Sequence, residues 1–374
     1  MSSFNSSFAR IAFWLHTTLG LGLGLLLLAL GVSGSVLIYR QSLERLWYPQ
    51  FYAISRLSGA VRLDAAVLAG TQAASGQLAS IRVPASPSDP LELLIRLERG
   101  GSLRVYVDPY SARVLGTRTN DWILAMHSFH HDLFVPGPGR TLLGWLGFGW
   151  MLLGLSGIVT VWRRRDSFLR AFRDPWSTRS LHYLVGTFML PLIIVIGFTA
   201  TAFTWGRQYT SALRTVLRQP AAQPLPRIEP TSGQASFDQL LLAAKSAVPG
   251  AIPTLIRLPA KATDPVSVHL AAEGDLRRIG HSQVWLHPAT AQVLRIAARN
   301  QRTLDARISD SFFPLHTGEF GGQIIRFIWF LSGFAPGLLF VSGFAVWIRR
   351  LWPKKWPAAS VSVPQTSISE GELA

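Results

Sequence analysis

The sequence contains no cysteine, and Asp, Glu, Lys and Arg together make up only 15% of its 374 residues. Without cysteine the chain forms no disulfide, zinc–thiolate site, iron–sulfur cluster or thioether-linked haem, and it has no thiol nucleophile. Acidic residues are the scarcer charge, 20 against 36 Lys and Arg, which gives a net charge of +16. A soluble domain carries about a quarter charged residues, so a soluble cytosolic enzyme is excluded.

Four long runs free of charged side chains predict an integral membrane protein. We place the spans at residues 11–39, 141–162, 181–205 and 327–348, since a helix needs about 20 residues to cross the hydrocarbon layer. Pro191 and Pro336 interrupt the third and fourth spans, and we expect each to kink its helix. The first run exceeds the roughly 7–15 apolar residues of a signal peptide and lacks a cleavage site, so we expect it to be retained. With four spans, the positive charge favours anionic lipid or an anionic ligand over nucleic acid.

Arginine near the span ends predicts the orientation. The short loop 163–180 contains six arginines, and the tail 349–374 opens with Arg349 and Arg350. Positive residues in short loops favour the cytoplasm. We therefore predict residues 1–10, the loop and the tail inside, and the connectors 40–140 and 206–326 outside.

The two outer connectors contain matching segments. Residues 81–91 match 256–266, and residues 105–115 match 284–294. The second segment of each pair reads as strand, turn and strand, with Pro109 or Pro288 in the turn, and helices are expected at 63–74 and 237–248. The predicted fold class is an α-helical membrane protein with four transmembrane helices and two small α/β modules, in which the unit of span, module and span is used twice as a parallel repeat.

Four histidines follow the same repeat. His130 and His316 each precede an Arg, Ser and Gly at the same separations, namely Arg140, Ser156 and Gly157, and Arg326, Ser342 and Gly343. His16 corresponds to His182. Ionisable residues in spans are costly and usually functional. His16 and His182 are expected near the inner surface, and His130 and His316 near the outer surface on interfacial segments 121–135 and 311–322.

Two imidazoles from different helices in apolar surroundings are a ligand set that suits haem b iron. Glycines one turn after His16 and His182, Gly20 and Gly186, would leave room for a macrocycle, although such glycines also serve helix packing. Two haem b groups per chain are predicted. Arg140 and Arg326 are candidate contacts for the propionates of the outer haem, and His127 or His131 are alternatives to His130. His269, His281 and His287 are expected on the surface.

The motifs around these residues resemble the PepSY-associated transmembrane family. The likeness lies in residues 105–115, in 129–133 with 137–140, 155–157 and 162–164, and in 315–318 with 341–343 and 347–350. Some members are inner-membrane ferric-siderophore reductases with two b-type haems. The resemblance implies PepSY-like periplasmic modules, His16 and His182 on an inner haem, and His130 and His316 on an outer one. One departure is that His287 and Ala289 stand where the first module has Asp108 and Tyr110.

The favoured hypothesis is a dihaem reductase of the bacterial inner membrane, an oxidoreductase for iron uptake. It would pass electrons from a cytoplasmic or quinol donor to a periplasmic ferric siderophore or other ferric chelate. A Gly-x-Gly-x-x-Gly element after a strand is absent from the sequence, so the donor is expected to be separate. The alternative is a non-enzymatic PepSY regulator or adaptor of a periplasmic protease or uptake system. A proton-coupled carrier is disfavoured, because the spans have no charged residue at mid-membrane.

Overall fold

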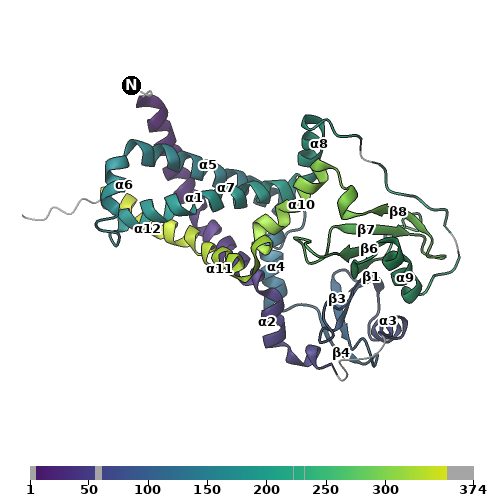
Figure 1. Ribbon diagram of the computed structural model, residues 1–374. Helices are drawn as coiled ribbons and strands as arrows, with labels where there is room; N and C mark the ends of the chain where they lie inside the picture. The colour runs from purple at the N-terminus through teal and green to yellow at the C-terminus, as the bar shows by residue number, and fades with distance from the viewer. Residues whose placement is uncertain (1–5, 55–60, 222, 231, 352–374) are drawn as a thin grey trace, which may run out of the picture.

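The protein consists of a long helix bundle joined end-on to a β-sheet region, as the computed structural model in Figure 1 shows. The structure describes residues 6–54, 61–221, 223–230 and 232–351. The predicted tail 349–374 therefore lies outside the described residues from 352 onward. The start of the first helix, α6 (Arg165–Ala171) and the end of the last helix lie at the bundle end far from the sheet.

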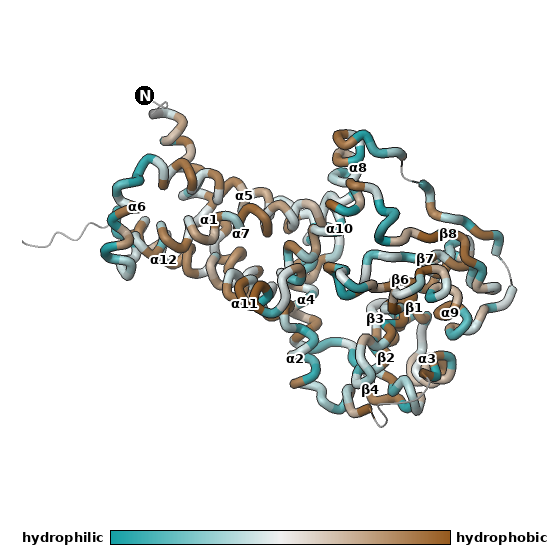
Figure 2. Tube along the Cα trace, viewed as in Figure 1, coloured by the Kyte–Doolittle hydropathy of each residue, from teal (hydrophilic) through white to brown (hydrophobic). Residues whose placement is uncertain are grey.

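Four segments of the bundle are long and apolar enough to cross a membrane. They are α1 (Ser6–Ile38), α5 (Pro138–Arg163), α7 (Thr178–Thr204) and the pair α11 (Gly322–Ser332) and α12 (Ala335–Leu351). Hydrophobic residues run along these helices, and hydrophilic residues gather around α6 at the bundle end (Figure 2). This distribution is the one expected of a multi-pass membrane protein.

The fourth span, which we predicted over 327–348 with an interruption at Pro336, consists of two helices. The helix breaks at Gly333 and Phe334, immediately before α12. Pro336, where a kink was expected, lies two residues after this break in the first turn of α12, where the missing N–H of proline costs no hydrogen bond. Pro191, the other predicted kink, lies inside α7, which is one uninterrupted helix.

The spans pack as a ring in the order α1, α5, α7 and α12. Small residues allow close approach of neighbouring backbones: a Cβ on Gly147 of α5 would lie 2.8 Å from the carbonyl oxygen of Gly197 in α7. Close approach of this kind is how helices associate in lipid, where burial of apolar surface contributes little. The helices α1 and α7 lie diagonally across the ring.

Each outer connector folds into a helix and a four-stranded antiparallel meander. The first contains α3 (Leu63–Gln72), β1 (Gln77–Arg82), β2 (Leu91–Arg96), β3 (Ser102–Val107) and β4 (Val114–Arg118). The second contains α9 (Phe237–Ala247), β5 (Ile252–Arg257), β6 (Val266–Ala271), β7 (Ser282–Leu286) and β8 (Val293–Ala297). The helices and strand–turn–strand units lie where the sequence placed them, to within three residues.

The two meanders form one continuous eight-stranded sheet in the order β4-β3-β2-β1-β5-β6-β7-β8. The antiparallel pair β1–β5 joins them, and Ile81 faces Ile256 in its register. The helices α3 and α9 bury their apolar sides in one shared core against the sheet. Asp64 of α3 accepts a 2.7 Å hydrogen bond from the backbone N–H of Phe237, at the start of α9.

Short helices connect the sheet to the bundle. The first connection contains α2 (Arg40–Trp47), the 3₁₀ turn Pro49–Tyr52 and α4 (Trp122–Asp132). The second contains α8 (Gly206–Val216), the 3₁₀ turn Arg299–Gln301, α10 (Leu304–Thr317) and the 3₁₀ turn Glu319–Gly321. The helices α4 and α10, which carry His130 and His316, pack against α1 and α7 respectively. They are the helices that bring the outer histidines to the bundle.

Candidate cofactor sites in the helix bundle

The structure brings the four repeated histidines together as two facing pairs. The ring centroids of His16 (α1) and His182 (α7) lie 6.1 Å apart. Those of His130 (α4) and His316 (α10) lie 6.2 Å apart. Each pair joins residues from the two halves of the chain, so neither site is complete in one half.

Both inner histidines are held by their Nδ1 atoms. His16 Nδ1 lies 3.1 Å from the carbonyl oxygen of Leu153 and 3.2 Å from the hydroxyl of Ser156. His182 Nδ1 lies 3.1 Å from the carbonyl oxygen of Leu339 and 3.0 Å from the hydroxyl of Ser342. A carbonyl oxygen only accepts, so Nδ1 carries the proton and Nε2 keeps its lone pair.

The outer pair is held in the same way. His130 Nδ1 lies 3.0 Å from the carbonyl oxygen of Leu30 and 3.1 Å from the hydroxyl of Ser33. His316 Nδ1 lies 2.8 Å from the hydroxyl of Thr199, which donates its own proton to the carbonyl oxygen of Val195 at 2.7 Å. All four rings thus have Nδ1 occupied as a donor, an arrangement typical of metal-ligating histidines because it fixes the tautomer and the ring orientation.

The spacing within each pair suits one metal ion between two imidazoles. With a metal–nitrogen distance of about 2 Å and roughly 1 Å from that nitrogen to the ring centre, centroids on opposite sides of a metal lie about 6 Å apart. The observed values are 6.1 and 6.2 Å. Direct hydrogen bonding between the rings would not explain this spacing, because each Nδ1–H already has a partner and both Nε2 atoms are acceptors.

The inner pair opens into a large apolar cavity of about 420 Å³ inside the ring of spans, within the range of about 300–1,000 Å³ that small-molecule and cofactor sites occupy. Its walls include five glycines that lie next to the histidines or within about two helical turns of them: Gly20, Gly24, Gly157, Gly186 and Gly343. A Cβ on Gly157 would lie 3.3 Å from Cε1 of His16, and one on Gly343 would lie 3.0 Å from Cε1 of His182. The hydroxyl of Thr187, also on the wall, is buried without a hydrogen-bond partner in the described part of the chain. These features fit a flat, largely apolar group between the two rings.

The outer imidazoles are neutral at physiological pH. Burial lowers the pKa of His130 to about 4 and that of His316 to about 3. Both lie outside the four spans, on α4 and α10. A neutral imidazole is the form that binds metals.

The alternatives to His130 lie elsewhere on α4. His127 and His131 stack on each other, with ring centroids 5.2 Å apart and 12° between the planes. His130 is the histidine of this segment whose ring faces His316. The geometry therefore favours the register that the repeat suggests.

The two arginines that recur at the same position of the internal repeat cap helix ends. Arg140 Nη2 donates to the carbonyl oxygen of Phe203 at 2.8 Å, and Arg326 donates to that of Ile38. These carbonyls are at the C-terminal ends of α7 and α1, where cations are favourable. The predicted contact of Arg140 and Arg326 with propionates stays a prediction.

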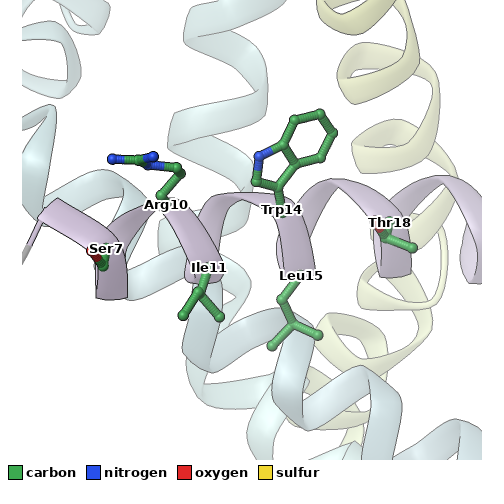
Figure 3. Close-up of a pocket in the computed structure, with 6 residues that line it drawn as sticks. All are labelled: Ser7, Arg10, Ile11, Trp14, Leu15 and Thr18. Carbon is green, nitrogen blue, oxygen red and sulfur yellow. The ribbon is translucent and has the colours of Figure 1, made fainter.

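A second hollow lies on the outside of α1 (Figure 3). It is lined by six residues of that one helix: Ser7, Arg10, Ile11, Trp14, Leu15 and Thr18. Arg10 and Trp14 point to one side of the helix and Ile11 and Leu15 to the other. A groove on a single helix that mixes Trp and Arg is typical of a span end at the membrane surface, so we assign it no chemistry.

Comparison with known proteins decides the family. The family described as PepSY-associated TM region matches residues 13–350, which includes both histidine pairs, all four spans and the whole sheet. The chain belongs to this family. One relative is an uncharacterised protein of Pseudomonas aeruginosa, 27% identical over 252 residues that cover 60% of this chain and 62% of that protein. The match thus spans less than two thirds of the relative. Since that protein is uncharacterised, the match assigns no activity to this PepSY-associated chain.

Two features of the site were missed in the sequence. The outer histidines are hydrogen-bonded to hydroxyl groups of the first and third spans, namely those of Ser33 and Thr199. The hydroxyls of Ser156 and Ser342 play the same part for the inner histidines. Their signal was the equal separation of 17 residues from His16 to Ser33 and from His182 to Thr199.

The expectation that His281 lies on the surface was wrong. Its side chain is 9% exposed, and its Nδ1 lies 2.8 Å from Asp275. His287 closes a turn: its Nδ1 accepts from the N–H of Ala289, just as Asp108 accepts from that of Tyr110.

Proposed function

We propose that this PepSY-associated protein holds two haem b groups and is a transmembrane reductase of ferric chelates. The observation that carries the proposal is the pair of imidazole pairs, each spaced for one metal and each with Nδ1 fixed as a donor. Bound haem would supply an iron centre that takes up and releases one electron. His16 and His182 would hold the inner group, and His130 and His316 the outer one.

The separation of the two pairs supports transport of electrons across the membrane. Ser33, which holds His130, is 17 residues beyond His16 on α1, and so lies about 25 Å farther along the helix. Thr199 and His182 repeat this separation on α7. Two redox centres so placed would lie near opposite faces of a hydrocarbon layer about 30 Å thick.

The orientation follows from charge. The arginine-rich end around α6 would face the cytoplasm, and the sheet would face the periplasm of a bacterial inner membrane. A cytoplasmic or quinol donor would then serve the inner site. The acceptor would be a ferric siderophore or other ferric chelate outside, whose iron(III) gains one electron to become iron(II), which hard oxygen ligands hold less tightly.

A haem count tests the cofactor proposal. The protein, produced with ample haem supply and purified in detergent, should show two haem b groups per chain and a reduced-minus-oxidised difference spectrum. His16→Ala and His182→Ala should each remove the inner haem, and His130→Ala and His316→Ala the outer one. His287→Ala, which removes a turn contact in the sheet, is the matched control and should keep both.

Proteoliposomes test the reaction. With a reductant sealed on the α6 side and a ferric chelate on the other side, an iron(II)-specific chromogenic chelator should report reduction that every ligand variant abolishes. Four variants that each keep two haems would overturn the ligand assignment. A folded, colourless protein would favour the alternative function, a PepSY regulator or adaptor.

A further inference from the structure

Four arginines line the inner cavity at its end near α6. Arg164 lies between α5 and α6, and Arg165 is the first residue of α6. Arg179 is in the first turn of α7, and Arg350 is in the last turn of α12. Within the described residues, no Asp or Glu lines the cavity. The space is therefore apolar around the histidines and positively charged at one end.

Three of these arginines have guanidinium groups with unused donors. Within the described part of the chain, the side chains of Arg164, Arg179 and Arg350 make no hydrogen bond or ion pair. The guanidinium carbon of Arg350 lies 5.2 Å from the ring centroid of Phe13. Arg165 instead has an exposed contact with Asp166 at 4.0 Å. The outer arginines differ, since Arg140 and Arg326 donate to backbone carbonyls.

A ligand that matches this cavity has a flat apolar body and carboxylates along one edge. Haem b has this shape, with two propionates on one side of the macrocycle. Guanidinium groups bind carboxylates in a bidentate geometry that fixes orientation as well as position. Resting on the proposed function, we propose that Arg164, Arg179 and Arg350 bind the propionates of the inner haem. The carboxylate edge then faces the α6 end, and the opposite edge faces the middle of the bundle.

Haem and its dimethyl ester, which lacks both carboxylates, separate this proposal from general effects of charge. Binding is measured on apo-protein in a His316→Ala background, so that only the inner site loads. The dimethyl ester should bind the parent at least about tenfold more weakly than haem does. The triple variant Arg164→Gln, Arg179→Gln and Arg350→Gln should bind haem more weakly by a similar factor. The ester should bind the triple variant and its parent equally.

The redox potential gives a second readout. Removing the three positive charges leaves the propionates uncompensated near the iron and favours the ferric state, so the midpoint potential of the inner haem should fall. The matched control combines Arg163→Gln, Arg170→Gln and Arg173→Gln. These three arginines belong to the loop 163–180 but do not line the cavity. This control has the same change in net charge and should alter neither affinity nor potential.

The inference is overturned if the ester and haem bind the parent equally, or if the control triple variant loses as much affinity as the test variant. If His16 and His182 still bind haem in that case, the proposed function is unaffected. Failure of the parent to bind haem at all would overturn both.

Discussion

The glycines beside the inner histidines offer a sharp test of haem binding that spares the ligands. In Gly343→Ala, the new Cβ would lie 3.0 Å from Cε1 of His182, where a carbon contact prefers about 3.5–4.0 Å. The ring must therefore move by about half an ångström or more. Its Nδ1 is hydrogen-bonded to Leu339 and Ser342 of the same helix as Gly343, so the displacement strains these hydrogen bonds.

Overpacking of this kind costs about 1–3 kcal/mol, which corresponds to roughly a 5- to 150-fold loss of haem affinity. Gly157→Ala should lose less, because its Cβ would lie 3.3 Å from Cε1 of His16. Unfolding would not explain the loss, since alanine favours a helix over glycine by about 1 kcal/mol.

The assay is titration of apo-protein with haem, followed at the Soret band in the His316→Ala background. Gly22→Ala is the control, because a Cβ there meets nothing within 4 Å. The reasoning is refuted if Gly343→Ala binds haem as tightly as Gly22→Ala, or if Gly157→Ala loses more affinity than Gly343→Ala.

Three further predictions concern the hydroxyl beside an inner histidine and the first connector. Ser342→Ala should weaken haem binding at the inner site about 10- to 100-fold, because it removes one partner of His182 Nδ1; unchanged affinity in the same titration would contradict this. Arg118→Met should destabilise the protein by about 3–5 kcal/mol in denaturant unfolding, since it leaves Asp121 buried without its cation and leaves buried Glu44 paired with Arg40 alone. The exposed pair of Arg165 and Asp166 serves as its control, and Arg165→Gln should cost less than about 1 kcal/mol. Burial opposes ionisation of Glu92, but Arg104, Arg82 and Arg40 outweigh it and lower its pKa from 4.5. A lowered pKa stabilises the folded state above the unfolded-state pKa, and this stability is lost as pH falls through the folded-state value. Thermal unfolding should therefore show a loss of stability in acid below about pH 4.5, and Glu92→Gln should flatten that dependence; an equal dependence in both proteins would contradict the assignment.

The two meanders of the sheet show where prediction from the sequence succeeded. Both strand–turn–strand units lie where the matched segments predicted them, because alternation and turn residues are local properties of the chain. The sequence did not predict that β1 and β5 pair and join the two meanders into one sheet. Pairing of two edge strands depends on which edges the rest of the fold brings together.

The fourth span was predicted only in part. Pro336 indicated an interruption, but the sequence did not indicate that the chain breaks at Gly333. There a side chain would meet the hydroxyl of Ser35 and the carbonyl oxygen of Gly31 on α1. Hydropathy reports burial in lipid and carries no information about such a close crossing.

By itself the sequence determined the four membrane spans, the two α/β modules and the family, since apolar length and motif spacing are written along the chain. It also singled out His16, His182, His130 and His316 through their matched positions. Only the tertiary structure decided that these residues face each other at 6.1 and 6.2 Å, that their Nδ1 atoms are occupied, and that arginines line one end of the inner cavity. The reason is that the partners come from helices more than 90 residues apart in the chain, and their approach is set by packing rather than by any local pattern.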